Sequence, residues 1–172
     1  MTNRLFLFIV LSFLLVQCTP TQGEIKSDAE PEVKNVILLI GDGMGVSQVY
    51  SGITANKGLN MEKAQFVGLS KTYSANDYIT DSAAGGTALA TGTKTNNGAI
   101  GVDENGTEIK SILEHAAENG LSTGLVASCA ITHATPASFV AHQPKRSMQE
   151  EIAVDFVNSD ITLFIGGGRK YF

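Results

Sequence analysis

Asp42 is the first residue along this sequence that could bind a metal ion or a phosphate. It follows the apolar run 36–40 and lies between glycines, in Gly41-Asp42-Gly43-Met44-Gly45. A carboxylate at the end of a strand is a common ligand of zinc and of hard cations, and the glycines let a ligand approach the backbone. A dinucleotide-binding loop would need a third glycine where Val46 stands, which weakens that interpretation. A simple Asp-Gly turn is the alternative, and this motif alone favours it.

Ser82 is a candidate nucleophile. It begins a predicted helix in which small residues follow, in Asp81-Ser82-Ala83-Ala84-Gly85-Gly86. The free amide N–H groups at a helix N-terminus bind anions, so a hydroxyl placed there faces a position suited to phosphate. A bound metal could help to ionise that hydroxyl. The alternative is that Asp81 or Ser82 only caps its helix, which is the usual role of such a residue.

The elements that would position these residues alternate between strand and helix. Strands are predicted at 36–40, 66–72 (a weaker candidate), 121–127 and 161–165, and helices at 46–57, 82–90, 109–119 and 147–158. This order predicts an α/β fold with a mainly parallel central sheet flanked by helices. Ligands of such sheets bind beyond the carboxyl ends of the strands, where Asp42 lies.

Composition excludes several classes of protein. The formal charge is −5, which argues against nucleic acid as a partner. Cys18 and Cys129 are the two cysteines, too few for a disulfide framework. The apolar neighbours of Cys129 predict an inert, buried thiol.

The first residues predict export. The apolar run 5–16 suits the core of a signal peptide and is short for a membrane span of about 20 residues. Leu15-Val16-Gln17-Cys18 resembles a bacterial lipobox, although Gln17 stands where a small residue is usual. We therefore expect a signal peptide or lipobox at 1–18 and a flexible tether at 19–34, in a protein of the bacterial periplasm or cell envelope. A lipid anchor to the membrane through Cys18 and ordinary cleavage a few residues later are the two alternatives.

Several sequence blocks, in this order, resemble the alkaline phosphatase family. The resemblance covers nearly all of residues 35–172, which we interpret as the N-terminal part of that family's catalytic domain. The blocks are Asn35-Val-Ile-Leu-Leu-Ile-Gly-Asp42-Gly-Met-Gly, Thr80-Asp81-Ser82-Ala-Ala, Lys94-Thr-Asn-Asn-Gly-Ala-Ile-Gly-Val-Asp103, Thr132-His133-Ala134-Thr135-Pro136-Ala137, Ala141-His142, and Ile165-Gly-Gly-Gly-Arg-Lys-Tyr-Phe172.

The resemblance implies hydrolysis of small phosphate monoesters through a phosphoserine on Ser82. Arg146 matches the arginine that clamps two phosphate oxygens, a task that suits a planar guanidinium. Asp81 is expected to orient Arg146, and simple helix capping is its alternative.

The resemblance also implies a pair of zinc ions and a magnesium ion. Asp42 matches the carboxylate that bridges one zinc to the magnesium, and Thr135 matches a hydroxyl ligand of the magnesium. His133 stands at the metal site where some family members carry aspartate and others histidine. A histidine should hold a hard magnesium ion less firmly than a carboxylate does. His142 is expected to make structural hydrogen bonds, and Glu114 and His115 to face solvent.

The sequence departs from the family in its zinc ligands, which family members supply from Asp- and His-rich motifs far downstream. After His142 the chain has no further histidine. We therefore expect an incomplete α/β fold in a fragment that is inactive alone and forms a homodimer when full length. Two alternatives stay open: a non-catalytic phosphate- or anion-binding module, and a related phosphodiesterase or sulfatase.

Overall fold

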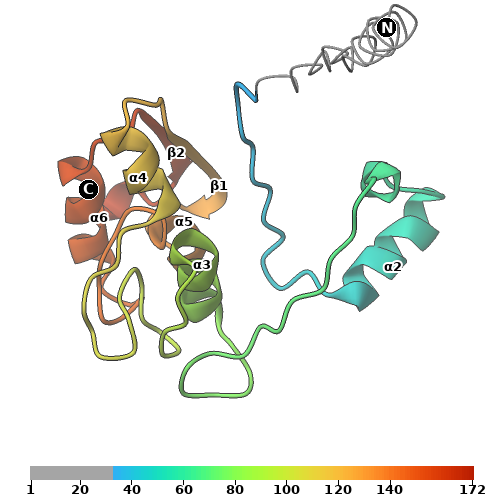
Figure 1. The fold of residues 1–172 in the computed structure, drawn as a ribbon, viewed down its shortest axis with the longest axis horizontal. Coiled ribbons are helices and arrows are strands. Elements are labelled where there is room, and N and C mark those ends of the chain that lie inside the picture. Colours follow the sequence, from blue (N-terminus) through green and yellow to red (C-terminus); the bar gives the residue numbers. More distant parts are fainter. Residues whose placement is uncertain (1–32) are drawn as a thin grey trace, which may run out of the picture. The chain divides into compact units, whose positions relative to one another are not determined.

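The computed structural model describes residues 33–172 (Figure 1). The chain divides into two units, one ending at Leu39 and one spanning Ile40–Phe172. The predicted signal peptide or lipobox at 1–18 lies outside the described residues, as does nearly all of the predicted tether at 19–34. Among the described residues, no helix is long and apolar enough to cross a membrane.

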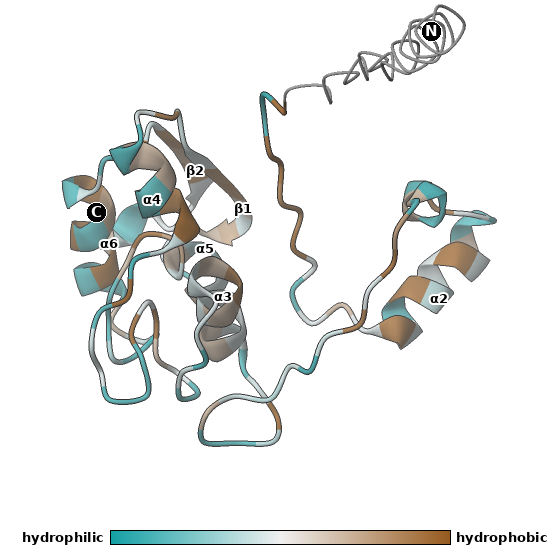
Figure 2. Ribbon diagram, viewed as in Figure 1, coloured by the Kyte–Doolittle hydropathy of each residue, from teal (hydrophilic) through white to brown (hydrophobic). Residues whose placement is uncertain are grey.

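The predicted central strand at 36–40 is wrong. These residues form a loop, coloured hydrophobic in Figure 2, and Ile37 and Leu39 are 83% and 88% exposed. A strand that is apolar on both faces is stable when neighbouring strands pair with it and helices cover it. Within residues 33–172 nothing pairs with this run, so its β propensity produces no strand. The weaker prediction at 66–72 is wrong for the same reason, and Leu69 there is 98% exposed.

The second unit begins with a helix that the sequence predicted, α2 (Val46–Asn56). It ends at Lys57, which adopts the left-handed conformation with φ 56°. The short 3₁₀ helix η1 (Asn60–Lys63) follows.

Helix α3 (Ser82–Thr91) is confirmed with its predicted cap, because the Asp81 side chain accepts a hydrogen bond from the backbone N–H of Ala84. It packs closely against the short helix α5 (Ala134–Ala137). Gly86 allows this approach, since a Cβ there would lie 2.9 Å from Ser138 Oγ and 3.4 Å from Thr135 Cα.

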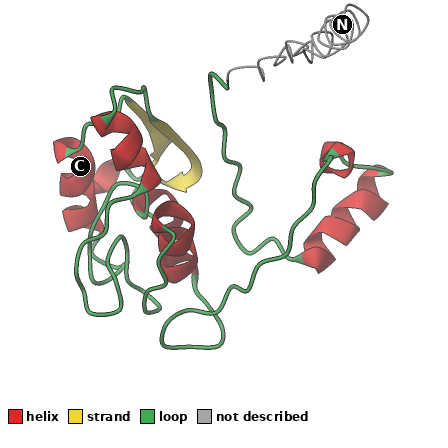
Figure 3. Cartoon of the chain, in the orientation of Figure 1, coloured by secondary structure: helices red, strands yellow, loops and turns green. Residues whose placement is uncertain are grey.

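The sheet has two parallel strands within the described residues, β1 (Gly124–Ala130) and β2 (Leu163–Gly167) (Figure 3). Leu125 pairs with Phe164, and the crossover between the strands carries α5 and α6 (Gln149–Asn158). Helix α4 (Ile112–Glu118) precedes β1, and the 3₁₀ helix η2 (Arg169–Tyr171) follows β2. The predicted α/β class with parallel strands and flanking helices is therefore confirmed, as an incomplete arrangement.

The core of the second unit lies between these helices and the sheet. Phe156 of α6 is buried and meets Phe164 of β2 edge to face, with ring centroids 5.2 Å apart. The other large buried apolar side chains come from α4, α6 and the connecting loops: Ile100, Val102, Leu113, Ile131, Phe139, Val140 and Ile152.

The loop between α3 and α4 is paired with the segment that follows α5. Ile100 and Gln143 exchange backbone hydrogen bonds, each of 2.9 Å, in an antiparallel bridge. Gly101, next along the loop, has φ +60°. A Cβ there would overlap the carbonyl oxygen of Ala141 and lie 2.8 Å from His142 Nδ1. Glycine is therefore required at this position both for its φ and for space.

We predict that Gly101→Ala lowers the free energy of unfolding by more than about 3 kcal/mol, since a conformational cost and a backbone clash add. Gly92→Ala is the matched control. Gly92 also has positive φ (+71°), but among the described residues no heavy atom other than those of Gly92 and its two chain neighbours lies within 4 Å of its added Cβ. Gly92→Ala should cost about 1 kcal/mol. Urea unfolding measures both, and equal losses would contradict the clash.

Candidate active site

Ser82 and Asp81 stand where α3 begins. Asp81 Oδ1 accepts the 2.9 Å bond from Ala84 N, and Ser82 is the first residue of the helix. The residues after it, Ala83 and Ala84, are buried and have small side chains, so their own side chains do not block access to Ser82. This leaves Ser82 Oγ at the positive end of the helix dipole, where an anion is favoured.

The loop after α3 holds Asp81 from a second side. The backbone N–H of Gly98 donates to Asp81 Oδ2 over 3.1 Å, and Asp81 N donates to Asn97 Oδ1 over 3.0 Å. Asn97 also donates through Nδ2 to the carbonyl of Ile79 at 2.8 Å. Sequence reasoning missed the role of Asn97. Its place in the block 94–103 was a signal, but its contacts cannot be deduced from that block alone.

Arg146 joins this group through one nitrogen. Its Nη1 donates to Asp81 Oδ2 at 3.1 Å and to Ser82 Oγ at 2.9 Å. Its backbone N–H donates to the carbonyl of Gly98 at 2.7 Å, which fixes the residue against the same loop. The structure therefore brings together Asp81, Ser82 and Arg146, three residues that the sequence predicted for one site.

The charges of this group are mutually stabilising. Burial alone would raise the pKa of Asp81, but hydrogen bonds from the amides of Ala84 and Gly98 and the guanidinium of Arg146 outweigh it and hold that pKa below its ordinary value. Asp81 thus keeps Arg146 paired and oriented. The positive charge beside Ser82 Oγ favours ionisation of that hydroxyl.

Asp42 and Thr135 form a second group. Thr135 Oγ1 donates to Asp42 Oδ2 over 2.8 Å. Asp42 lies in a turn in which Met44 N donates to Gly41 O, not at the end of a strand as predicted, because no strand precedes it. Thr135 lies on α5, the helix that packs against α3 at Gly86.

The carboxylate and hydroxyl of the second group fit magnesium, which prefers hard oxygen ligands. His133, at the N-cap of α5, is exposed and makes no capping hydrogen bond through its side chain, so its imidazole is accessible beside Thr135 in sequence. Zinc does not fit in the same way. Among the described residues, no three His, Cys, Asp or Glu side chains come together as a metal site, whereas zinc is typically held by three or four such ligands.

Three predictions about other side chains have mixed outcomes. His115 is exposed as expected, but Glu114 is not free in solvent, because its Oε1 lies 2.9 Å from His142 Nε2. His142 makes the structural hydrogen bonds that were predicted. Cys129 is a free thiol, but it is partly exposed and not buried.

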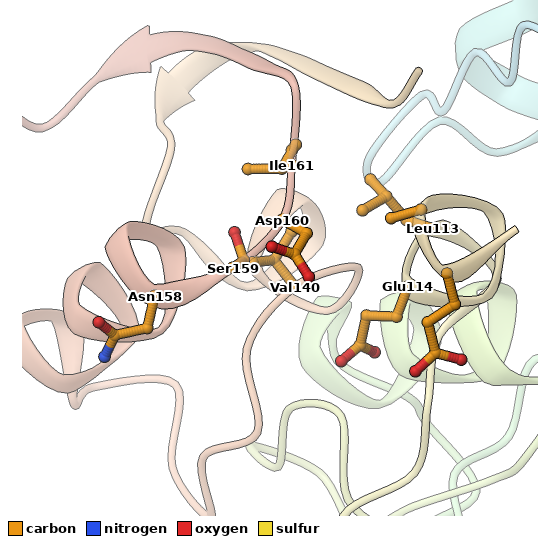
Figure 4. A pocket seen from close by; sticks show the side chains of 9 residues that line it. Leu113, Glu114, Val140, Asn158, Ser159, Asp160 and Ile161 are labelled. Atoms are coloured by element: carbon orange, nitrogen blue, oxygen red, sulfur yellow. The ribbon is translucent and has the colours of Figure 1, made fainter. Parts of the chain in front are cut away.

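A cavity of about 190 Å³ lies between α4 and the end of α6 (Figure 4). Glu114, Asp160 and Ile161 are among its lining residues. None of the six predicted site residues lines it. The cavity is therefore separate from the candidate active site, which lies at the start of α3.

Comparisons with known proteins agree on one family. A family model described as alkaline phosphatase matches residues 33–172. The chain is 44% identical over 170 residues to alkaline phosphatase 4 of Bacillus subtilis (strain 168), covering 88% of this chain and 36% of that relative. It is 36% identical over 174 residues to the human tissue-nonspecific isozyme, covering 80% and 33%. The chain thus spans about a third of the length of the curated relatives it matches.

Solved structures give the same result. Alkaline phosphatase from the Antarctic bacterium TAB5 matches with a TM-score of 0.74 and 49% identity, over 76% of this chain and 39% of that one. A variant of the TAB5 enzyme, in which aspartate replaces a histidine and magnesium is bound in its M3 site, matches with a TM-score of 0.74 and 48% identity, over 76% and 38%.

We predict that Asp81→Asn lowers the thermal midpoint at pH 7 by about 4 °C, because the amide loses its charge-assisted bonds. The folded pKa of Asp81 lies below its ordinary 3.8, so this contribution is complete above that pH and is lost as pH falls through the folded pKa. The difference in thermal midpoint between wild type and Asp81→Asn should therefore become smaller in acid. Thermal unfolding followed by circular dichroism between pH 2 and 7 measures it.

The matched control repeats this comparison in an Arg146→Gln background. There the effect of Asp81→Asn at pH 7 should be smaller, because its charged partner is gone. A gap that is independent of pH and of Arg146 would contradict the ion pair.

Proposed function

The chain belongs to the alkaline phosphatase family, and on that premise we propose that it supplies the nucleophile and the phosphate-binding arginine of an enzyme that hydrolyses phosphate monoesters. One observation carries the proposal: Arg146 Nη1 lies within hydrogen-bond distance of both Ser82 Oγ and Asp81 Oδ2. A nucleophile, a cation for the phosphate and a carboxylate that orients that cation are thus assembled at one helix N-terminus.

Substrate binding uses the donors that this group leaves free. Within residues 33–172 both side-chain hydrogen bonds of Arg146 use Nη1, so Nε and Nη2 are available for two oxygens of a phosphate dianion. The Ala84 amide is already bonded to Asp81 Oδ1, which leaves the amides of Ser82 and Ala83 as the first-turn donors of α3 for the anion. Local positive charge is needed there, since the formal charge of the whole chain is −5.

Chemistry then takes place at Ser82. The Oγ atom forms a bond to phosphorus as the bond between phosphorus and the ester oxygen breaks, which gives a phosphoserine and an alcohol. Water cleaves the Oγ–P bond, returns a proton to Ser82 and releases inorganic phosphate. Arg146 neutralises the equatorial oxygens in both steps, and Asp81 prevents the guanidinium from rotating away.

A magnesium ion would be held by Asp42 and Thr135, with His133 beside them. When bound, such an ion supplies positive charge that strengthens the field at the phosphate. A zinc pair would need ligands beyond those that the described residues bring together, so we derive no step from zinc. The full activity is proposed for a polypeptide in which this segment is joined to such ligands, a homodimer by resemblance to the family.

The anion-binding alternative has one observation in its favour. The group of Ser82, Asp81 and Arg146 is assembled in a chain whose described residues form no cluster of three metal ligands. A phosphodiesterase or sulfatase is disfavoured, because such enzymes would lack the arginine that contacts Ser82. Export, the cell-envelope location and a lipid on Cys18 are proposals that rest on residues 1–34 of the sequence.

We predict that the metal-loaded 172-residue chain alone hydrolyses an aryl phosphate no faster than background. Joined in frame to the remaining part of a related alkaline phosphatase domain, it should hydrolyse the ester. In that protein Ser82→Ala should reduce kcat by at least about 1,000-fold. Arg146→Lys should raise KM by about tenfold, through loss of paired donors.

Lys145→Ala is the matched control, since it removes the cation next to Arg146 and should leave both constants unchanged. Turnover by the 172-residue chain would overturn the need for further ligands. Full activity of Ser82→Ala would overturn the proposed nucleophile.

A second prediction concerns the metal. His133→Asp should tighten magnesium binding by about tenfold, because a carboxylate is a better ligand for this hard ion than an imidazole. Titration calorimetry with Mg²⁺ measures the affinity without any need for turnover. His115→Asp, which places a new carboxylate on an exposed site of α4, is the control. Equal magnesium affinities for wild type and His133→Asp would remove His133 from the metal site.

A further inference from the structure

His142 is held on three sides at the start of the segment that carries Arg146. Its Nδ1 lies 2.7 Å from the carbonyl oxygen of Gly101, and its Nε2 lies 2.9 Å from Glu114 Oε1. Its backbone N–H donates to Asp155 Oδ2 of α6 over 3.1 Å. A carbonyl and a carboxylate can only accept hydrogen bonds, so both ring nitrogens must carry hydrogen for both bonds to form. The geometry is that of an imidazolium.

Gly101 connects this imidazolium to the nucleophile helix. The backbone N–H of Gly101 donates to Thr87 Oγ1 over 3.0 Å, while its carbonyl accepts from His142. Thr87 is fully buried within α3, whose first residue is Ser82. Through one peptide unit on either side of Gly101, His142 is therefore coupled to the helix that presents the nucleophile.

The same loop connects His142 to the arginine. Beyond Gly101, the loop pairs Ile100 with Gln143, and Gly98 accepts from the backbone N–H of Arg146 at 2.7 Å. Gly98 also donates to Asp81 Oδ2. His142 and Arg146 thus lie at opposite ends of the segment 142–146, which is paired with the loop 98–101. Loss of the hydrogen bond between His142 and Gly101 would release the His142 end of that segment.

The partner carboxylate is itself fixed. Glu114 Oε2 accepts from Ser111 N over 2.7 Å in the capping box of α4, and Ser111 Oγ donates to the carbonyl of Phe139 over 2.6 Å. Glu114 therefore has little freedom to follow His142 if the histidine moves. This rigidity distinguishes the pair from an exposed ion pair, which contributes little.

From these contacts we infer that His142 is a positioning residue for phosphate binding: its bridge between Gly101 and Glu114 fixes the segment 141–146 so that Arg146 stays on Ser82. The inference rests on the proposed function, in which Arg146 binds the phosphate. His142 itself touches neither Ser82 nor Arg146.

The positioning role of His142 has an upper pH limit, because it requires the protonated imidazole. The hydrogen bond to Glu114 raises the pKa of His142 to about 9, against an opposing effect of burial, with further help from the Gly101 carbonyl and the charges of Glu114 and Glu108. Asp155 is a further charged group that faces His142, since its Oδ2 accepts a hydrogen bond from the backbone N–H of His142. A folded pKa above the ordinary 6.5 means that the stabilisation is complete below pH 6.5 and is lost as pH rises through about 9.

The test uses the 172-residue chain, with His142→Gln against the control His115→Gln on the exposed face of α4. NMR hydrogen exchange gives the protection factor of the Arg146 amide, and calorimetry gives the dissociation constant of inorganic phosphate, both between pH 7 and 10. His142→Gln should lower the protection and weaken phosphate binding by about tenfold each at pH 7.5. In wild type and His115→Gln, both quantities should fall as pH passes about 9, and in His142→Gln they should not.

Glu114→Gln covers the case in which His142→Gln fails to fold. It keeps an acceptor for Nε2 but removes the charge, so the fall in Arg146 protection should move to lower pH. The inference is overturned if His142→Gln matches wild type, or if Glu114→Gln leaves the pH of the fall unchanged. If wild type binds no phosphate at any pH, the phosphate site of the proposed function fails, and the Arg146 protection factors still decide the role of His142.

Discussion

The ion pair between Arg146 and Asp81 is the constraint on which the candidate site depends. Arg146 is about 40% exposed in its side chain, and a long cation at a surface would ordinarily sample many rotamers. Asp81 removes that freedom because its own carboxylate is fixed by two backbone amides, those of Ala84 and Gly98. One carboxylate therefore caps helix α3 and orients the Arg146 guanidinium toward Ser82. This arrangement needs no reorganisation when an anion arrives, which is the property that electrostatic catalysis requires.

The loop 97–101 transmits the constraint to the rest of the unit. It contacts Asp81 through Asn97 and Gly98, and it contacts helix α3 again at Thr87. It also pairs with the segment that carries Arg146. Gly101 allows the two backbones to approach closely, and His142 adds a charged bond across that approach. Backbone hydrogen bonds therefore hold the site together more than side-chain packing does. The two-stranded sheet supports the site mainly through α5, which contacts β1 and packs on α3.

Elements with their signals close together in sequence were predictable. Helix α3 was found because its cap, Asp81, is adjacent to it in sequence. Strand β1 was predicted at 121–127 and lies at Gly124–Ala130, an error in its bounds that local patterns cannot correct. The predicted strand at 36–40 is wrong because a strand forms where neighbouring strands pair with it. The sequence shows the β propensity of this run but not whether such partners are present.

The site divides in the same way. Ser82 and Asp81 were predicted from their place at the start of a helix as well as from the family resemblance, and Arg146 was predicted from the resemblance. The contacts of Asn97 with Asp81 and of Glu114 with His142 join residues 16 and 28 positions apart, with no local pattern to announce them. Such pairs form because loops distant in sequence fold back on α3 and α4. The hydropathy of α4 alone therefore predicted a solvent-facing Glu114, although Glu114 is hydrogen-bonded to the half-buried His142.

The most direct measurement of the central claim is a titration of the 172-residue chain with inorganic phosphate, followed by NMR. If the group at the start of α3 is assembled before a ligand arrives, the largest shifts should fall on the amides of Ser82 and Ala83 and on the guanidinium of Arg146. The same titration of Arg146→Lys should show much smaller shifts at Ser82. Shifts concentrated at the cavity lined by Glu114 and Asp160, or none at Ser82 and Arg146, would contradict the account.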